Sequence, residues 1–484
     1  MKKKSILIIL VLLLALQSTS CSSNSGDKTT DNNNETTAVT QTTTETESEY
    51  YSADYLPDED FGGYSFRMVN IEDDIFAPEE LTGESLNDSV YERNRLIEEK
   101  YNVVLTQTLT NTWDKNYAVL EQCSRAQTDD FDLIRLIMRE AFPATLNHII
   151  ASKEHLPYCD PTKPWYLKYM NDNLMIGGEY TLLYTEECFP TYQYTNAVYY
   201  NMSIAEDHGI GDLYTLVQDG KWTLDTFMQT AEIAVQDVNG DGTYNIEDDV
   251  LSYIGRFDTT IASLVNGTEY FLVKKDSDGI PVFDLSEGTL DVLLKLHNFN
   301  NTDGNYYDYW IDLVNQVDHT KHFSENHCLF FIDSVLTASD LREMENDFGL
   351  LPSPKKDEAQ SMYLSSVCDG YIAVAPLHSS DLERTSIILE SLAVESKNIV
   401  AVEYKESMLA EKVLRDEQSL AMLDIILDGR TVDMGVTVWM DPVRTSIIDK
   451  HFNKGNADFA SSVAANQEKI DTTLKTSVEK FLTE

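Results

Sequence analysis

The stretch 237–248 carries the clearest chemical signal in the chain. Five of its residues hold positions 1, 3, 5, 6 and 12 of an EF-hand-like loop: Asp237, Asn239, Asp241, Gly242 and Asp248. This spacing lets alternate oxygen donors converge on one hard cation. A plain turn that binds no metal is the alternative interpretation, because Asn, Gly and Asp also favour turns through their backbone preferences.

The remaining donors of this loop complete the predicted metal site. Thr243, at position 7, would offer its backbone carbonyl, and Asn245, at position 9, a side chain or a bridging water. Position 12 is Asp248 where Glu is usual, so a shorter carboxylate must close the loop and weaker binding is expected. The sequence predicts a structural Ca²⁺ with these ligands: Asp237, Asn239, Asp241, Thr243 and Asp248.

A short helix is predicted to lead directly into this loop. Thr223 can cap it, and the apolar residues that follow fall at helical spacing: Leu224, Phe227, Met228, Ala231 and Val235. Trp222, just before the cap, is expected to pack onto the helix as a staple. The metal loop would therefore stiffen the end of the helix.

The first 21 residues have the pattern of an export signal. Lysines at 2–4 precede an apolar run at 6–16, which is too short to remain as a bilayer span, and small residues stand before Cys21. A Cys in this place resembles the bacterial lipobox, which makes Cys21 the lipid-modified N-terminus, carrying acyl chains such as palmitate. Residues 22–57 follow as a disordered polar tether, with a reach of about 30 Å. We expect an exported lipoprotein at the extracellular face of the bacterial cell membrane.

The formal net charge of −46 limits the partners of this protein. So acidic a chain is repelled by nucleic acid and by anionic lipid surfaces. Neither is expected as a partner, and contact with the membrane is expected through the lipid anchor only. The length and the 42% hydrophobic composition are enough for two domains with their own cores.

The other cysteines and the histidines give weak signals. Five cysteines follow Cys21 without any CxxC pair, and we expect buried small hydrophobes, with a disulfide between Cys159 and Cys188 as the alternative. A cluster of histidines precedes an apolar strand: His319, His322 and His327. We interpret this cluster as an ordinary polar loop rather than as a zinc site.

The pattern of the chain from residue 58 onward alternates strands with helices. Strands are predicted at 64–69, 103–107 and 131–138, with helices at 87–101 and 113–126 between them. This order favours a mostly parallel sheet with helices on its faces. A second sheet is predicted from the strand-like segments at 192–202, 327–332 and 348–351, with a hairpin at Asp278-Gly279, a helix over 334–344, a strand at 371–375 and a helix over 381–396.

Several separated segments together resemble a known family. They include YLPDEDFGGYSFRMV, ESLNDSVYERNRLIEEKYNVVL, KPWYLKYMNDNLMIGGEYTLLY, GKWTLDTF running into DVNGDGTYNIEDD, FLVKKDSDGIPVF, FGLLPSPKKDEAQ and CDGYIAVAP. In this order they resemble extracellular solute-binding proteins, family 1 type, of bacterial ABC importers. The resemblance implies capture of a small solute, commonly a sugar or oligosaccharide, by cleft closure, with the permease subunits of an ABC importer as partners.

The same resemblance implies a fold and its division into lobes. The fold is α/β, the two-lobed periplasmic-binding-protein-like fold of type II, with lobes joined by hinge strands. Lobe 1 would comprise 58–190 plus about 368–400, and lobe 2 would comprise 191–367 plus about 401–484, with the calcium-type loop inside it. The chain would cross between the lobes near Pro190 and near Cys368.

A sugar site requires aromatic platforms together with short polar side chains, because sugars have apolar faces edged by hydroxyl groups. The candidate ligand-binding residues are Tyr194, Asn196, Trp310, Asp333, Asp369, Tyr371 and Trp439. For each aromatic residue, packing in a core or between domains is the alternative role.

Two other functional classes compete with solute binding. A secreted glycoside hydrolase needs two positioned carboxylates, but among 82 acidic residues any pair can be found, so the count is uninformative. The sequence contains no nucleophile elbow, HExxH motif or phosphate loop, and we do not expect an enzyme. A calcium-stabilised adhesion or scaffold module at the cell surface is the other alternative.

Overall fold

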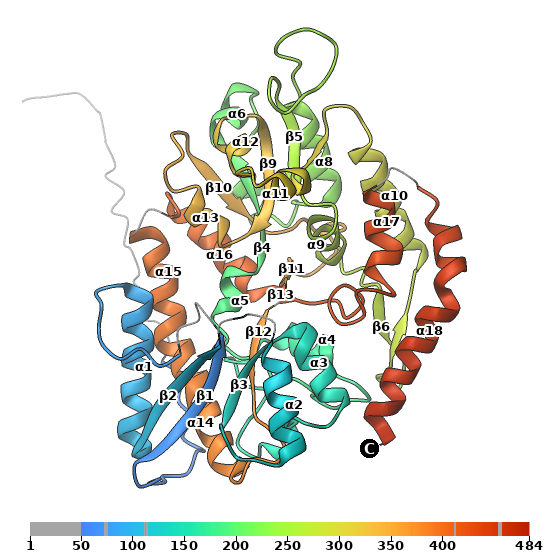
Figure 1. Cartoon of the computed structure of the whole chain (residues 1–484). Helices are drawn as coiled ribbons and strands as arrows, with labels where there is room; N and C mark the ends of the chain where they lie inside the picture. The colour runs from blue at the N-terminus through green and yellow to red at the C-terminus, as the bar shows by residue number, and fades with distance from the viewer. Residues whose placement is uncertain are drawn as a thin grey trace, which may run out of the picture. The chain divides into compact units, whose positions relative to one another are not determined.

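Two separate β-sheets organise this chain, each packed against helices (Figure 1). The structure is a computed structural model that describes residues 50–71, 76–110, 112, 115–368, 370–410, 413–453 and 457–483. Tyr50–Glu484 form one compact unit. The predicted lipidation residue Cys21, most of the tether and Asp369 lie outside the described residues.

The first sheet has the strand order β12-β3-β1-β2. Its strands are β1 (Tyr64–Ile71), β2 (Val103–Thr110), β3 (Leu133–Ile137) and β12 (Tyr371–Val374). The first three are parallel, and β12 returns antiparallel to β3. All five residues of β3 are buried, as expected of a parallel strand covered on both faces. The strands predicted in this part of the chain are confirmed.

Helices on the first sheet alternate with its strands. They are α1 (Ser85–Tyr101), α2 (Asn116–Ala126), α3 (Met138–Leu146), the 3₁₀ turn η1 (Lys153–His155), α4 (Lys168–Leu174) and α14 (Leu382–Glu395). The face of α1 that the spacing predicts is buried, with Val90, Asn94, Ile97 and Tyr101 inward. Asp381 caps α14 by accepting the Arg384 N–H, where the sequence predicts that helix to begin.

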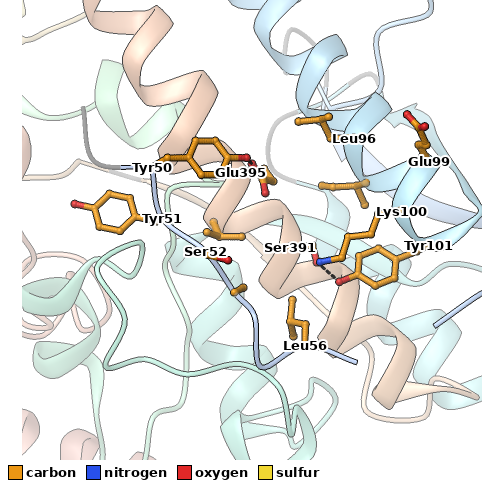
Figure 2. Close-up of a pocket in the computed structure, with 13 residues that line it drawn as sticks. Tyr50, Tyr51, Ser52, Leu56, Leu96, Glu99, Lys100, Tyr101, Ser391 and Glu395 are labelled. Atoms are coloured by element: carbon orange, nitrogen blue, oxygen red, sulfur yellow. Dashed lines mark hydrogen bonds between the residues drawn. The ribbon is translucent and has the colours of Figure 1, made fainter. Parts of the chain in front are cut away.

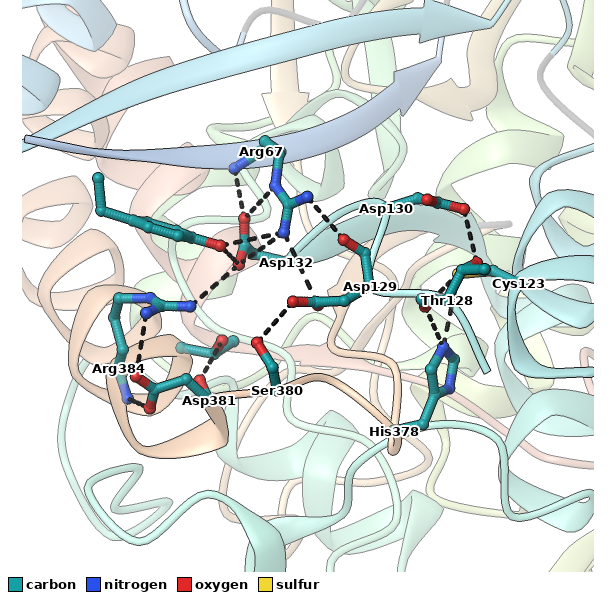
Figure 3. A network of polar contacts seen from close by, with 12 residues as sticks. Arg67, Cys123, Thr128, Asp129, Asp130, Asp132, His378, Ser380, Asp381 and Arg384 are labelled. Atoms are coloured by element: carbon teal, nitrogen blue, oxygen red, sulfur yellow. Dashed lines mark hydrogen bonds and ion pairs between the residues drawn. The ribbon is translucent and has the colours of Figure 1, made fainter. Parts of the chain in front are cut away.

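A polar network fastens α14 to the first sheet (Figure 3). The buried carboxylate of Asp132 accepts hydrogen bonds from Arg67 Nε at 3.0 Å and from the Tyr64 hydroxyl at 2.7 Å. Arg384, in the first turn of α14, lies 3.6 Å from the same carboxylate and covers the Tyr64 ring. Three parts of the chain are thereby held to one buried charge, which its partners compensate.

The second sheet is mixed, with the strand order β10-β4-β9-β5-β8. Its strands are β4 (Asn196–Asn201), β5 (Leu251–Gly255), β8 (Tyr306–Asp308), β9 (Cys328–Ser334) and β10 (Phe348–Leu351). β5 runs parallel to β8 and β9, whereas β4 runs antiparallel to β9 and β10. The hairpin β6 (Val273–Lys275) and β7 (Pro281–Phe283) turns at Gly279, whose φ of +76° favours glycine, so the predicted hairpin is confirmed.

The other helices lie around the second sheet, and two of them also contact helices of the first sheet. They are α5 (Pro190–Gln193), α6 (Met202–Asp207), α7 (Leu213–Gln218), α8 (Leu224–Ile233), α9 (Thr259–Gly267), α10 (Glu287–Asn300), α11 (Trp310–Asn315), α12 (Lys321–Ser324), α13 (Thr337–Asp340), α15 (Ala401–Ala410), α16 (Glu417–Asp428), α17 (Lys450–Phe452) and α18 (Phe459–Thr483). Two π-helical turns, η2 (Ser396–Val400) and η3 (Thr445–Asp449), interrupt the C-terminal helices. The predicted cap Thr223 and staple Trp222 are confirmed, because Thr223 accepts the Thr226 N–H and the Trp222 ring packs on Phe227.

Two predicted elements differ from the structure. The strand predicted over 192–202 begins only at Asn196, because Pro190 starts the short helix α5, a position that suits the fixed φ of proline. The helix predicted over 334–344 is reduced to α13. Pairing with β4 extends β9 as far as Ser334, so strand hydrogen bonds occupy the start of the segment.

Three of the segments that link the two sheets lie next to one another. The first runs from Glu186 through α5 to β4, the second from β11 (Ser365–Ser366) to β12, and the third through β13 (Arg430–Thr431). They bond to one another: Thr195 pairs antiparallel with Val367, and β11 pairs parallel with β13. The chain therefore passes between its sheets through one hydrogen-bonded strap.

Buried ion pairs hold the crossing segments together. Glu187 and Arg135 are both fully buried, with an N–O distance of 2.8 Å. Glu186 contacts Arg430 and Lys397, each at 3.0 Å. Burial raises the pKa of Glu186, but the charges of Arg430 and Lys397 lower it further, and the resulting pKa is about 2.

Candidate ligand-binding cleft

The ends of strands from both sheets meet at one cleft. β3 ends at Ile137, and α3 with Arg139 follows at once. β5 ends at Gly255 and is followed by α9, and β8 ends at Asp308. Ligands of open α/β sheets bind at the carboxyl ends of strands. Figure 1 shows α3 and α9 on either side of the crossing strands.

A cavity lies where these ends converge on the crossing segments. Its walls come from α3, α9, β11 with the two residues after it, and the stretch before η3: Arg139, Thr259, Ala262, Asn266, Ser366, Val367, Cys368, Asp433, Val436, Thr437, Met440 and Arg444. Its volume of about 30 Å³ has room for about two waters. The walls must move apart to admit a larger solute, as closure about a hinge implies.

A chain of ion pairs runs along the outer side of this cavity. Arg256 binds Asp258 through two hydrogen bonds, of 2.9 and 2.8 Å. Arg444 lies 3.6 Å from Asp258 and 3.3 Å from Asp449 in η3. Burial raises the pKa of Asp258, but the hydrogen bonds and charge of Arg256 lower it more, and the net shift is downward. A π-helical turn at such a place is typical of functional sites.

A second, wider cavity adjoins this chain of ion pairs. It has a volume of about 460 Å³, and its lining combines one aromatic ring with short polar side chains: Phe257, Thr445, Ser446, Asp449, Lys450, Asn453 and Asn466. Trp310 packs edge-on against Phe257 at 5.9 Å, with the Arg256 guanidinium 5.4 Å from its ring centre. Trp310 is 41% exposed, so it extends the aromatic surface outward. Such a surface suits a polyhydroxylated solute.

The structure brings three of the predicted ligand residues together on the crossing segments. The rings of Tyr194 and Tyr371 form an edge-on pair at 5.4 Å. Asn196 donates to the Cys368 sulfur at 3.2 Å, and Cys368 lines the inner cavity. These three residues lie next to the cleft, and their contact with a solute remains a prediction.

Two other predicted residues lie apart from this group. Asp333 accepts hydrogen bonds from the Tyr309 hydroxyl at 3.1 Å and from the backbone N–H of Ser334. Its carboxylate also lies 3.2 Å from His319 Nε2. Trp439 is 4% exposed and packs against Phe142 at 5.2 Å. Its packing is that of a buried residue, which is the alternative role that the sequence offers for each aromatic residue.

Several residues of the cleft are absent from the sequence-based set. Arg139 and Phe257 each follow the end of a parallel strand, and that position is the signal that could have identified them. Asn266 lies near the C-terminal end of α9, the helix that follows strand β5. Arg444 stands in an irregular stretch with no sequence signal at all.

Carboxylates of the predicted calcium loop accept hydrogen bonds from backbone N–H groups of the same loop. Asp237 accepts the N–H groups of Gly240 and Gly242, at 2.7 and 2.8 Å, and Asp241 accepts that of Thr243. Asp248 is exposed, whereas its neighbour Asp249 is buried and accepts the N–H groups of Val238 and Asn245. These hydrogen bonds lower the pKa of Asp249, that from Asn245 contributing most.

The donors of this loop are the oxygen type that Ca²⁺ prefers. Among the described residues, however, no three His, Cys, Asp or Glu side chains are gathered in a group that could hold a metal ion. Calcium would have to draw the carboxylates of Asp237 and Asp241 toward one point. The histidines near 319–327 are also separated, because His322 faces Asp312 at 3.3 Å and His327 contacts the Asp249 carbonyl.

The cysteines of the described chain are free thiols, so the alternative of a Cys159–Cys188 disulfide is wrong. Four of the five are buried, as the sequence predicts. Burial raises the pKa of both Cys159 and Cys188 to about 12, which keeps these thiols protonated and unreactive.

One further cavity, of about 360 Å³, lies away from the cleft, between α1 and α14 (Figure 2). Its wall includes Tyr50 and Tyr51, where the described chain begins. The Ser391 hydroxyl donates to the Tyr101 hydroxyl across it at 3.2 Å. Among the described residues, no helix is long and apolar enough to cross a membrane.

Comparison with known proteins places the fold. No protein family and no curated protein matches the sequence. The sugar-binding protein MalE of Xanthomonas citri is 14% identical, with a TM-score of 0.61 over 87% of this chain and 100% of its own. The structure of a sugar transporter from Rhizobium etli in an open conformation is 13% identical, with a TM-score of 0.56 over 87% of this chain and 100% of its own. A third similar structure is the galacto-N-biose-/lacto-N-biose I-binding protein of the Bifidobacterium longum ABC transporter, in complex with lacto-N-biose. It is 12% identical, with a TM-score of 0.52 over 87% of this chain and 99% of its own.

These similarities show the fold. The chain has the two-lobed α/β fold of the periplasmic-binding-protein type, as its sequence predicts. The crossing segments that link β3 to β4 and β11 to β12 are the connections between its two sheets.

Proposed function

We propose that the protein is the substrate-binding component of an ABC importer and captures a sugar or oligosaccharide by closure of its cleft. The permease subunits of that importer are its partners. The proposal is for binding without turnover of the solute.

One observation supports this proposal above all. The carboxyl ends of strands from both sheets meet at a cleft, and the strap of hydrogen-bonded crossing segments forms the floor of that cleft. The Cys368 N–H bonds the Tyr194 carbonyl at 3.0 Å, and Thr195 pairs with Val367. A change of backbone angles in such a strap moves one sheet relative to the other. A solute that contacts both walls only when they are close then shifts the population toward the closed state.

The anchoring of the protein is part of the proposal. Cys21 would carry the acyl chains, and the tether 22–57 would hold the binding unit near the extracellular face of the membrane. Two acyl chains give stable anchoring where one gives only reversible binding. If Cys21 is the anchor, cells supplied with a labelled fatty acid should incorporate the label into the wild-type protein, and Cys21→Ala should abolish this incorporation.

We also propose that the loop 237–248 binds one Ca²⁺ in a structural role. Its ligands would be Asp237, Asn239, Asp241, Thr243 and Asp248. Asp249 supports the loop from inside by its backbone hydrogen bonds. The loop follows α8, whose inward residues pack in the core, so ion binding would stabilise the second sheet rather than touch the solute.

A thermal-shift screen of the chain from residue 22 onward tests the main proposal. Mono- and oligosaccharides, peptides and polysaccharide fragments are compared at equal concentration. A solute that binds only the folded state raises the melting temperature by mass action. We expect a saturable shift with one glycan class, and unchanged glycan on chromatography. Absence of any saccharide-dependent shift would contradict the proposal.

A variant pair locates the binding. Tyr371→Ala removes half of the ring pair beside the cleft and is expected to weaken binding about two- to tenfold, since an aromatic contact contributes about 0.5–1.5 kcal/mol. Tyr169→Ala, at an exposed ring away from the cleft, is the control and should bind normally. Equal affinities of the two variants would place the solute elsewhere.

A further inference from the structure

Two arginines line the inner cavity of the cleft in a strongly acidic protein. The chain has 36 Lys and Arg against 82 Asp and Glu. Yet the charged groups that line this cavity, among the described residues, are Arg139, Arg444 and Asp433. Arg139 belongs to the first sheet's helix α3, whereas Arg444 belongs to the stretch that leads into η3. The two guanidinium groups thus belong to different walls.

Asp433, the one carboxylate among the described lining residues, is directed at the backbone. Asp433 accepts the N–H groups of Leu272, Val273 and Gly435, at 2.6, 3.2 and 2.8 Å. It is 1% exposed. Asp433 therefore stabilises the turn beside it and is not directed at a solute between the arginines.

Arg444 keeps hydrogen-bonding capacity beyond its ion pairs. Its Nη2 faces Asp258 and its Nε faces Asp449, and neither pairing uses Nη1. A guanidinium has five N–H donors, so donors remain for a planar anion. Asp258 is also shared with Arg256, so one carboxylate serves two guanidinium groups.

The helices that begin at the cavity favour the same charge. Arg139 is the second residue of α3 and Thr259 the first of α9. The N-terminus of a helix attracts anions through its dipole and its free N–H groups. Asp258 already caps α9 by accepting the Thr259 N–H, whereas no side chain caps α3 among the described residues. α3 is therefore the helix that retains this capacity, although Glu140 lies in its first turn.

The cavity wall contains a buried hydrogen-bond acceptor, Asn266 Oδ1, that a ligand hydroxyl group would satisfy. Asn266 is 1% exposed, and its Nδ2 donates to Ser366 at 2.6 Å. Its Oδ1 has no hydrogen-bond partner among the described residues. A buried acceptor without a donor is unfavourable, and a ligand hydroxyl would satisfy it where a carboxylate could not.

We propose that the solute is an acidic sugar, whose carboxylate is held between Arg139 and Arg444 while a hydroxyl donates to Asn266. This inference rests on the proposed sugar-binding function. It narrows the solute class from sugars in general to uronic-acid-containing saccharides. The described residues that line the inner cavity include no aromatic side chain, so recognition there depends on charge and hydrogen bonds rather than on stacking.

Matched oligosaccharides test this proposal by isothermal titration calorimetry of the chain from residue 22 onward. Each pair differs only in carbon 6, as galactose and galacturonate oligomers or glucose and glucuronate oligomers do. We expect at least one acidic member to bind ten or more times as tightly as its neutral partner. Its Kd should rise with salt, because the recognised group is charged.

Variants connect the preference to the named residues. Arg139→Gln and Arg444→Gln should each reduce the acid-to-neutral preference at least tenfold, whereas Arg125→Gln, at an exposed side chain of α2, should leave it unchanged. Asn266→Asp keeps the shape of the wall and adds a negative charge, so it should weaken acid binding selectively. Thermal melts of each variant check folding.

The outcomes separate the two proposals. If neutral oligosaccharides bind as tightly as acidic ones, or if Asn266→Asp leaves the preference unchanged, the acidic-sugar inference is overturned and the sugar-binding function stands. If no saccharide of either kind binds, the sugar-binding function itself is wrong and this inference fails with it.

Discussion

Two charged regions of the protein differ in how their carboxylates are satisfied. The hinge cluster consists of Arg135, Glu186, Glu187, Lys397 and Arg430, and its charges neutralise one another away from water. In the loop 237–249, the carboxylates accept backbone N–H groups from residues close in sequence. The hinge cluster depends on partners that only the fold brings together, whereas the loop depends on its own spacing.

This difference implies different consequences of mutation. Removing one member of a buried ion pair leaves an uncompensated buried charge, which is strongly destabilising. An exposed carboxylate that loses its partner can be solvated by water. The hinge cluster should therefore govern stability, and the loop should respond mainly to added ions.

The largest effect is expected at Arg135. Arg135→Ala leaves Glu187 buried without its partner and should reduce the free energy of unfolding by about 3–5 kcal/mol, measured in urea. The double variant Arg135→Met, Glu187→Leu is the control and should recover most of this loss, since no charge is left in the interior. A loss below about 1 kcal/mol for the single variant would show that the buried pair is already solvated.

The second effect concerns pH and Glu186. Its folded pKa is about 2, below the ordinary 4.5, so the ionised carboxylate stabilises the fold above pH 4.5 and this contribution is lost as the pH falls through about 2. Above pH 4.5 the ionised carboxylate contributes about 3 kcal/mol to the free energy of unfolding. Glu186→Gln should lack it, so the stability difference between wild type and variant should shrink between pH 4.5 and 2. A constant difference over this range would refute the assignment.

Calcium should have a smaller effect, and at a different place. At a concentration about 100 times its Kd, an ion that binds only the folded state adds about 2.7 kcal/mol of stability. EGTA should then lower the melting temperature without abolishing solute binding, and Asp241→Ala should be insensitive to EGTA. Asp291→Ala, an exposed acid on α10, is the charge-matched control. Loss of all solute binding in folded Asp241→Ala would argue for a direct role in the cleft.

The smallest effect is expected at an exposed ion pair. Lys295 and Asp225 are 2.6 Å apart, closer than the 2.8 Å of Arg135 and Glu187, but both are about half exposed. Lys295→Ala should cost only about 0.2–1 kcal/mol in urea unfolding, because water screens the pair and solvates the remaining charge. A cost equal to that of Arg135→Ala would mean that distance, not burial, decides the energy.

Local patterns in the sequence predicted much of the fold. The alternation of strands and helices predicted the first sheet, and local patterns predicted the inward face of α1, the hairpin at Gly279, the cap of α8 and the start of α14. Each of these depends on contacts within a few residues or on a regular period. The failures lie at 192–195, where Pro190 starts the short helix α5, and at 334–344, where pairing with the distant strand β4 extends β9.

The cleft was predicted only in part for the same reason. Tyr194, Asn196 and Tyr371 lie beside it, but Arg139, Asn266 and Arg444 come from three distant elements and share no spacing. The sequence by itself determined which segments become strands and helices and where a metal loop can form, because neighbouring residues set local backbone hydrogen bonds. Only the tertiary structure decided which charges meet, such as Arg430 and Glu186 across 244 residues, because such pairs depend on how the crossing segments join.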